Sequence, residues 1–361
     1  MSTSPKVRVL VIDDSALMRK LIPGILARDP EIEVVGTAMD GNFGLKKIEE
    51  LKPDVVTLDL EMPRMDGLET LRQITRNYRL PVVVVSAHSV NGATATFKAL
   101  SLGAFDFVPK PFDAAVAHME GIADQLVGKV KAAAKAGAPK PRTSLAENVR
   151  PQKPVRRPYR RADKVIAIGI STGGPNALQN LLSQLPGDFG GAIIVVQHMP
   201  EGFTDLFAQR LNECCAIEVK EARSGDMLLA GRALICPGNR HMRVRRMPLG
   251  EVVVLGDDEK INGHRPSVDV MYQSVAQELG GKSIALLMTG MGEDGAEGLG
   301  EVKAAGGLTV AQDEHSCVVF GMPKAAIERG HAMRVVPLDA LPNLLIRHCA
   351  EVQAEKAAVG D

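Results

Sequence analysis

The chain has 361 residues, which is enough for two domains with separate hydrophobic cores. Its hydrophobic content of 45% is ordinary for a globular protein, and 43 basic residues balance 43 acidic ones. No apolar stretch approaches the roughly 18 residues of a membrane span, and the N-terminus does not resemble a signal peptide. We therefore expect a cytoplasmic protein without membrane insertion, whose five cysteines are reduced thiols.

From residue 7 to about 130, short apolar runs alternate with amphipathic segments. This alternation predicts an α/β fold, with a five-stranded parallel sheet and helices on both of its faces. The expected strands are Val7–Ile12, Ile32–Gly36, Val55–Leu58, Pro81–Val85 and Phe105–Val108. The expected helices are Ala16–Leu26, Gly44–Leu51, Leu68–Ile74, Ala93–Leu100 and Ala114–Val130.

Polar residues stand at four of these strand ends. Asp13 and Asp14 follow the first strand, and Asp59 ends the third. Ser86 ends the fourth, and Lys110 follows the fifth. The carboxyl ends of parallel strands meet at one edge of the sheet, where open α/β folds place their sites. Each acid alone is readily explained as a helix cap, but together the three carboxylates predict a magnesium site, because oxygen ligands suit Mg²⁺.

A basic segment breaks the α/β pattern after the first domain. Residues 129–161 contain five Lys and six Arg against a single acid, so we expect a solvated linker. Basic clusters also suit nucleic acid, but the large output region argues against a DNA-binding module, and we expect no nucleic-acid partner. The predicted divisions are a domain at 1–128, a basic Pro/Ala-rich linker at 129–162, a domain at 163–350 and a frayed tail at 351–361.

The second domain is again predicted as α/β, a doubly wound sheet with helices between its strands. The expected strands are Val165–Ile168, Ala192–Val196, Ile284–Met288 and Leu308–Val310. A β-hairpin is expected in the middle of the domain, with arms near Met242–Arg246 and Val252–Leu255.

Ser171 lies in a tight turn between the first of these strands and a helix. The sequence Gly-Ile-Ser-Thr-Gly at 169–173 aims backbone N–H groups at whatever lies beside the turn. That geometry suits a nucleophilic serine with an oxyanion hole, or a phosphate cradle. The segment fits the G-x-S-x-G nucleophile-elbow pattern, whereas no Lys follows the glycines as in a Walker A loop.

A serine nucleophile needs a base and an acid that orients the base. His198 emerges at a strand end, as Ser171 does, and Asp294 follows another apolar strand. The α/β-hydrolase order Ser…Asp…His would instead pair Ser171 and Asp294 with His315 or His331. The pattern alone leaves both assignments open.

Three other residues of the second domain also stay open at this point. Glu293 is as good an acid as its neighbour Asp294 by sequence alone. His241 and His264 lie in loop-like, Arg-rich segments, where each is either a substrate-facing group or a surface residue.

The first third of the chain resembles a response-regulator receiver domain, through Val11–Ser15, Leu58–Pro63, Asp66–Gly67 and Gly103–Pro111. The resemblance implies a flavodoxin-like fold in which Asp59 accepts phosphate from a CheA-type histidine kinase. The implied magnesium ligands are Asp13, Asp14, Asp59 and the backbone carbonyl of Glu61. The implied phosphate-sensing residues are Ser86, Phe107 and Lys110, with a cis peptide bond between Lys110 and Pro111.

Residues 165–335 resemble the catalytic domain of the CheB family, chemotaxis protein-glutamate methylesterases and glutamine deamidases. The matching segments are Ser171–Gly174, Gln197–Phe203, Pro237–Met242, His264–Asp269, Thr289–Gly295 and Ser316–Pro323. The resemblance implies that Ser171 is the nucleophile, His198 the base and Asp294 the orienting acid. The candidate oxyanion donors are the N–H of Thr172 and the loop around Met291.

The two resemblances together imply a function. The chain would demethylate glutamate γ-methyl esters, and deamidate glutamines, on methyl-accepting chemoreceptors. Phosphorylation at Asp59 would need Mg²⁺, and the esterase reaction would need no cofactor. We expect a monomer, and we hypothesise that the unphosphorylated receiver covers Ser171.

Overall fold

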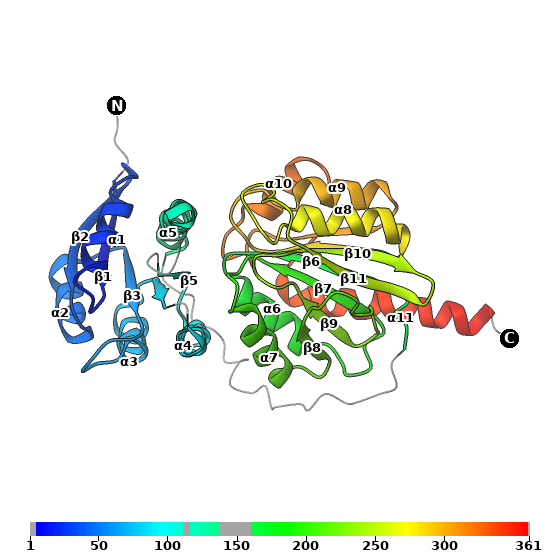
Figure 1. Ribbon diagram of the computed structural model, residues 1–361, viewed down its shortest axis with the longest axis horizontal. Coiled ribbons are helices and arrows are strands. Elements are labelled where there is room, and N and C mark those ends of the chain that lie inside the picture. The colour runs from blue at the N-terminus through cyan, green and yellow to red at the C-terminus, as the bar shows by residue number, and fades with distance from the viewer. Residues whose placement is uncertain (1–4, 88, 111–115, 138–159, 360–361) are drawn as a thin grey trace. The chain divides into compact units, whose positions relative to one another are not determined.

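The chain forms two compact units, one within residues 1–143 and one within 144–361 (Figure 1). The computed structural model describes residues 5–87, 89–110, 116–137 and 160–359. Within those ranges, no helix combines the length and the hydropathy that crossing a bilayer requires.

The first unit is built on a parallel sheet with the strand order β2-β1-β3-β4-β5. The strands are β1 (Val7–Ile12), β2 (Ile32–Ala38), β3 (Val55–Asp59), β4 (Val82–Ser86) and β5 (Asp106–Pro109). The helical segments are α1 (Met18–Leu26), α2 (Gly41–Leu51), α3 (Gly67–Gln73), η1 (Ile74–Tyr78), α4 (Val90–Ser101) and α5 (Val116–Ala136). All the expected elements are confirmed, with ends that differ by a few residues.

Local chemistry explains where these elements lie. The central strands β3 and β4 are buried along their whole length, so they appear in the sequence as continuous apolar runs. Short polar side chains cap the helices that connect the strands. Asp40 accepts a hydrogen bond from the Phe43 N–H at the start of α2, and Asp66 accepts one from the Glu69 N–H at the start of α3.

Helix α5 extends to Ala136, past the position where we expected the linker to begin. Val130 and Ala133 of this extension are fully buried in the core of the first unit. Lys129 forms an ion pair with Asp106, at 3.2 Å. The lysines that suggested a linker therefore lie on the polar side of an amphipathic helix. Most of the remaining expected linker lies outside the described residues.

The second unit is built on a seven-stranded sheet in which all neighbours are parallel, with the order β14-β13-β12-β6-β7-β9-β8. Its strands are β6 (Val165–Ile170), β7 (Ala192–Gln197), β8 (Glu218–Glu221), β9 (Arg232–Ile235), β12 (Ser283–Leu287), β13 (Leu308–Gln312) and β14 (Arg334–Val336). The expected hairpin is confirmed as β10 (His241–Met247) and β11 (Gly250–Gly256). Strands β8, β9 and β14 were not expected.

Helices cover both faces of this sheet, with α8 and α9 on one side and α6 and α7 on the other (Figure 1). The helical segments are α6 (Gly174–Ser183), α7 (Thr204–Cys214), α8 (Val268–Leu279), η3 (Gly280–Lys282), α9 (Ala296–Ala304), α10 (Met322–Glu328), η4 (Leu338–Ala340) and α11 (Leu341–Val359). Helix α11 continues up to residue 359, through most of the segment where we expected a frayed tail.

Strand β6 is the point at which the chain reverses its direction across the sheet. The chain first runs from β6 to β7 on one side, and later returns to β12 on the other. Open α/β sheets bind their ligands at such a switch point, beyond the carboxyl ends of the strands. The fold therefore places the residues that follow β6, β7 and β12 at a candidate site.

The packing of the extended part of α5 can be tested by shortening one of its buried side chains. In the receiver expressed as residues 1–137, we expect Val130→Ala to lower the free energy of unfolding by about 1–3 kcal/mol, because it removes buried methyl groups. Lys135→Ala, at an exposed position of the same turn, is the control. Urea denaturation followed by circular dichroism measures both, and equal midpoints for the two variants would contradict the packing of the extension.

Candidate functional site

The turn that carries Ser171 is held on both sides by the neighbouring strand-end loops. The Ser171 N–H donates to the Thr289 carbonyl, at 3.0 Å, in the loop after β12. The Ser171 carbonyl accepts from Gln197 Nε2 at the end of β7, at 3.0 Å, and from the Gly174 N–H, at 2.8 Å. The backbone at Ser171 is therefore fixed by both adjacent strands before any ligand binds.

Two glycines allow the loops to approach this closely. Gly173 has φ +74°, and a Cβ there would lie 2.5 Å from Val318. A Cβ on Gly290 would lie 2.2 Å from Met322 Sδ and 2.8 Å from Ser171 Cβ. Any larger residue at Gly290 would therefore push the loop away from the serine.

His198 and Asp294 are brought together from the ends of two other strands. His198 Nε2 lies 2.8 Å from Asp294 Oδ2. Because an ionised carboxylate only accepts hydrogen bonds, the proton lies on Nε2 and leaves a lone pair on Nδ1. Nδ1 is buried and has no hydrogen-bond partner among the described residues. The His198 N–H donates to the carbonyl of Ile170, at 3.1 Å, which ties the base to the residue before Ser171.

Asp294 is buried, and several donors surround it. Ser267 Oγ donates to Oδ1 at 2.7 Å, and the Val268 N–H at the start of α8 donates to Oδ2 at 2.7 Å. Burial alone would raise the pKa of Asp294, but the hydrogen bond and charge of His198, with the donors from Val268 and Ser267, outweigh it. The pKa of Asp294 is therefore below its usual range, so the carboxylate is ionised at neutral pH.

Sequence reasoning did not find the residues that support Asp294. The Ser267 N–H donates to His241 Nδ1 at 3.2 Å, and His241 Nε2 donates to the Glu259 carbonyl at 2.9 Å. His241 is fully buried, so it is neither a substrate-facing group nor a surface residue, and its role is structural. The signal for Ser267 was its place in the segment 264–269, which resembled the CheB family.

A second buried carboxyl lies behind Asp294. Asp269 accepts hydrogen bonds from the Gly298 N–H, at 2.7 Å, and from Asn262 Nδ2, at 2.8 Å. Burial raises the pKa of Asp269, the Gly298 N–H lowers it, and the neighbouring charge of Asp294 raises it further. The negative charge of this acidic pair is therefore concentrated on Asp294, next to the histidine.

The other sequence candidates do not join this group. His331 Nδ1 bonds to the carbonyl of Ala296, at 2.8 Å, and the His315 side chain is exposed. Glu293 forms an ion pair with Arg329. His264, in contrast, stacks on His198, with ring centroids 4.0 Å apart and an interplanar angle of 8°.

Two backbone amides beside Ser171 are free to bind an oxyanion. Within the part of the chain that the structure describes, the N–H groups of Thr172 and Met291 donate to no acceptor, whereas the N–H of Ser171 is already used. The Thr172 carbonyl accepts from Thr289 Oγ1, at 3.0 Å, which joins the two turns. The arrangement offers a candidate nucleophile, a candidate base, a candidate orienting acid and candidate oxyanion donors.

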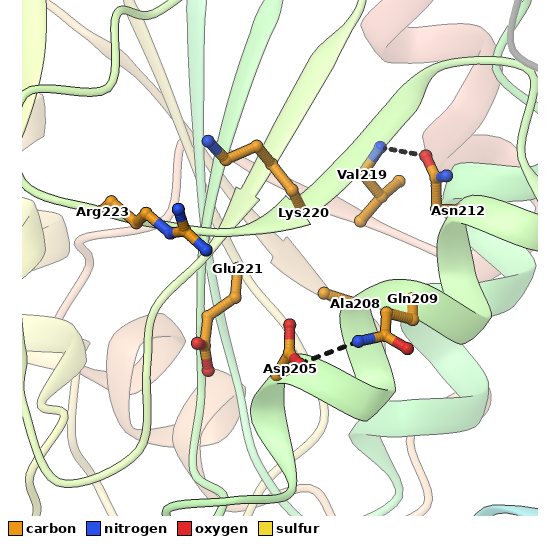
Figure 2. Close-up of a pocket in the computed structure, with 8 residues that line it drawn as sticks. All are labelled: Asp205, Ala208, Gln209, Asn212, Val219, Lys220, Glu221 and Arg223. Carbon is orange, nitrogen blue, oxygen red and sulfur yellow. Dashed lines mark hydrogen bonds between the residues drawn. The ribbon is translucent and has the colours of Figure 1, made fainter.

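A cavity of about 310 Å³ elsewhere in the second unit contains none of these residues. It lies between α7 and the edge strand β8 (Figure 2). Its polar side chains partly satisfy one another, since Gln209 donates to Asp205 and Asn212 accepts from the Val219 N–H. The Val219 N–H points away from the sheet, because β8 is an edge strand. Its hydrogen bond to Asn212 leaves it unavailable for pairing with a further strand.

The first unit gathers the acids expected at its sheet edge. Asp13, Asp14 and Asp59 offer carboxylate oxygens that all lie within 4.8 Å of one another. Lys110 Nζ lies 2.7 Å from Asp59 and 3.5 Å from Asp13. Burial raises the pKa of Asp59 to about 6, although Lys110 opposes this shift. Asp13 Oδ2 accepts no hydrogen bond among the described residues. Converging carboxylates with an oxygen left over fit a hard divalent cation.

The other receiver residues lie around this cluster. The Glu61 N–H donates to Asp59 Oδ1 at 3.2 Å, which places the Glu61 backbone beside the acid. Ser86 Oγ faces α4, where it donates to the Gly92 carbonyl at 3.1 Å and accepts from Thr96 Oγ1 at 2.6 Å. Phe107 is buried. Pro111 lies outside the described residues, so the expected cis bond stays a prediction.

Comparison with known proteins decides the family. The model of the CheB methylesterase family matches residues 166–345, and that of the response regulator receiver domain matches residues 9–119. A protein-glutamate methylesterase/protein-glutamine glutaminase 2 of Koribacter versatilis is 65% identical over 352 residues, which cover 96% of this chain and 97% of that protein. The chain belongs to the CheB methylesterase family.

Other CheB relatives agree with this assignment. A protein-glutamate methylesterase/protein-glutamine glutaminase of Pyrococcus horikoshii is 44% identical over 354 residues, 95% of this chain and 93% of that protein. The crystal structure of the Thermotoga maritima CheB methylesterase catalytic domain is 42% identical, with a TM-score of 0.50, and the match covers 52% of this chain and 98% of that chain. The predicted fold class, a receiver joined to a CheB catalytic domain, is confirmed.

The burial of Asp59 in this CheB family member makes stability depend on pH. A pKa of about 6, above the ordinary 3.8, stabilises the fold at low pH, and this contribution is lost as the pH rises through 6. Without Mg²⁺, we expect the stability advantage of Asp59→Asn over the wild type to grow by up to about 3 kcal/mol between about pH 4 and pH 8. Denaturant unfolding of the receiver with EDTA measures this, with the exposed Glu50→Gln as the control. Parallel pH curves for Asp59→Asn and the wild type would contradict the burial cost.

Proposed function

We propose that this chain is a phosphorylation-activated hydrolase that demethylates glutamate γ-methyl esters, and deamidates glutamines, on chemoreceptors. The observation that carries the proposal is the position of Ser171, His198 and Asp294 beyond three neighbouring parallel strands, in a chain that also contains a receiver. The names of the relatives, protein-glutamate methylesterase/protein-glutamine glutaminase, support the substrate class.

The reaction begins with proton transfer from Ser171 to His198. His198 Nδ1 accepts the Ser171 hydroxyl proton while Oγ attacks the ester carbonyl, and the N–H groups of Thr172 and Met291 bind the oxyanion. The protonated His198 then gives its proton to the leaving methoxide, and methanol departs. Water, deprotonated by Nδ1, hydrolyses the acyl-enzyme and restores Ser171. With a glutamine substrate the leaving group is ammonia.

Asp294 serves the base in two ways. Its hydrogen bond to Nε2 fixes the tautomer in which Nδ1 is free, and its negative charge stabilises the imidazolium that forms during attack. The donors from Ser267 and Val268 keep the carboxylate ionised and in place. No step in this sequence needs a metal ion or an organic cofactor.

The receiver supplies the control. Asp59 is the phosphoryl acceptor, and the residues that would hold Mg²⁺ are Asp13, Asp14, Asp59 and the backbone carbonyl of Glu61. The chemistry that bound Mg²⁺ supplies there is to offset the charge of the carboxylate and the incoming phosphoryl group. Lys110 pairs with the phosphoryl oxygens. The Ser86 hydroxyl must leave its partners on α4 to reach them, and the packing of Phe107 changes with it.

The partners follow from the two chemistries. A histidine kinase supplies the phosphoryl group to Asp59, and methylated chemoreceptors are the substrate. We propose that the protein acts as a cytoplasmic monomer, and that phosphorylation relieves an inhibition by the receiver.

The assignment of the three residues can be tested by methanol release from methylated receptors. We expect Ser171→Ala, His198→Gln and Asp294→Asn each to lower kcat by about 10⁴-fold or more, because these groups act as a unit. His331→Gln is the control, and it should retain nearly full activity. Loss of activity in His331→Gln with retention in His198→Gln would contradict the assignment and favour the α/β-hydrolase order.

The role of Asp59 can be tested in the same assay with a small-molecule phosphodonor. We expect Mg²⁺ and acetyl phosphate to stimulate the wild type. Asp59→Asn should keep the unstimulated rate and lose the stimulation, because it lacks the acceptor carboxylate. EDTA should abolish stimulation of the wild type without changing its basal rate. Stimulation of Asp59→Asn equal to that of the wild type would contradict phosphorylation at this residue.

A further inference from the structure

His264 contacts the catalytic base through the face of its ring. The imidazoles of His198 and His264 are nearly parallel, at 8°, with centroids 4.0 Å apart. Within the described residues, the hydrogen bonds of His264 are backbone bonds with Ile261, and its ring takes part in the stack on His198. The stack on His198 is therefore the specific contact that this side chain makes among the described residues.

Hydrogen bonds hold the loop that carries His264 on both sides of this residue. Ile261 and His264 exchange two backbone hydrogen bonds, of 2.9 and 3.1 Å. The intervening Asn262 has φ +53°, and its side chain is fixed on Asp269. On the other side, the guanidinium of Arg265 is held by the side-chain oxygen of Asn239, at 2.7 and 3.0 Å. Because the backbone is held on both sides of His264, its ring is suited to keep the stacked ring of His198 in place.

The charge of His264 is also controlled by its surroundings. The charged or titratable groups that act on it are His198, Asp294 and Lys260. Burial lowers its pKa to about 4, and His198 lowers it further, while Asp294 opposes the shift. His264 is therefore neutral at neutral pH, and the face of a neutral aromatic ring attracts a cation above it.

We propose that His264 is a positioning residue that holds the plane of the His198 ring and stabilises its protonated form. This inference rests on the proposed function, in which His198 becomes an imidazolium when it takes the Ser171 proton. The stack then supplies two effects. It keeps Nε2 directed at Asp294 and Nδ1 on the opposite side, and it offers the cation an aromatic face from which water is excluded.

A matched pair of substitutions tests the proposal in the full-length chain. His264→Phe keeps an aromatic face, whereas His264→Leu fills similar space without one. In the methanol-release assay with Mg²⁺ and acetyl phosphate, we expect His264→Phe to retain near wild-type kcat. We expect His264→Leu to lose about 2- to 30-fold in kcat with little change in KM. The acid limb of its kcat/KM profile should move to lower pH by about 0.4–1.5 units.

Thermal unfolding shows whether both variants are folded. If His264→Leu is not, His264→Gln takes its place with the same expected loss. Equal kcat and equal acid limbs for the aromatic and the non-aromatic variant would overturn the proposal, as would a change confined to KM. A wild-type chain that releases no methanol would instead overturn the proposed function. Activity in the wild type, with no difference between the two variants, would overturn only the role of His264.

Discussion

The hydrogen bond between His198 Nε2 and the buried Asp294 carboxylate is the interaction on which the proposed chemistry of the second unit depends. It fixes which imidazole nitrogen is free, and the hydrogen bonds from Val268 and Ser267 add to that of His198 in compensating the burial of the charge. Those donors come from the start of α8, whereas Asp294 follows β12 and His198 follows β7. The parallel sheet, with its switch point at β6, is what brings these distant segments together.

The two units use the same topological solution for opposite electrostatic purposes. In each, a buried acid lies beyond the carboxyl end of a strand in the parallel sheet. Asp294 receives hydrogen bonds from Ser267, Val268 and His198, and its pKa falls. Burial raises the pKa of Asp59 to about 6, with a smaller contribution from the charge of Asp13, although Lys110 opposes the shift. One environment stabilises the anion, whereas the other penalises it, which agrees with the proposed binding of a cation and a phosphoryl group at Asp59.

Sequence periodicity could predict the buried strands, because β6, β7 and β12 are continuous apolar runs, and their ends indicated Ser171, His198 and Asp294. Periodicity did not predict β8 and β14, which are short and partly polar. These segments form strands because they pair with a neighbouring strand, and their own residue pattern does not indicate it. The prediction placed the end of α5 too early, because it relied on the composition of the basic segment. Composition does not distinguish lysines on the polar side of a helix from lysines in a linker. The stack of His264 on His198 and the support of Ser267 by His241 depend on loop conformations that no spacing encodes.

The tautomer of His198 tests this relation between fold and chemistry most directly. Long-range ¹H–¹⁵N spectra of the histidine rings in the full-length chain, with His198 assigned through His198→Gln, report which nitrogen carries the proton. At a mildly alkaline pH, we expect hydrogen on Nε2 and an unprotonated Nδ1, with this preference lost in Asp294→Asn. Hydrogen on Nδ1 in the wild type would contradict the arrangement, because the base would then have no lone pair to offer Ser171.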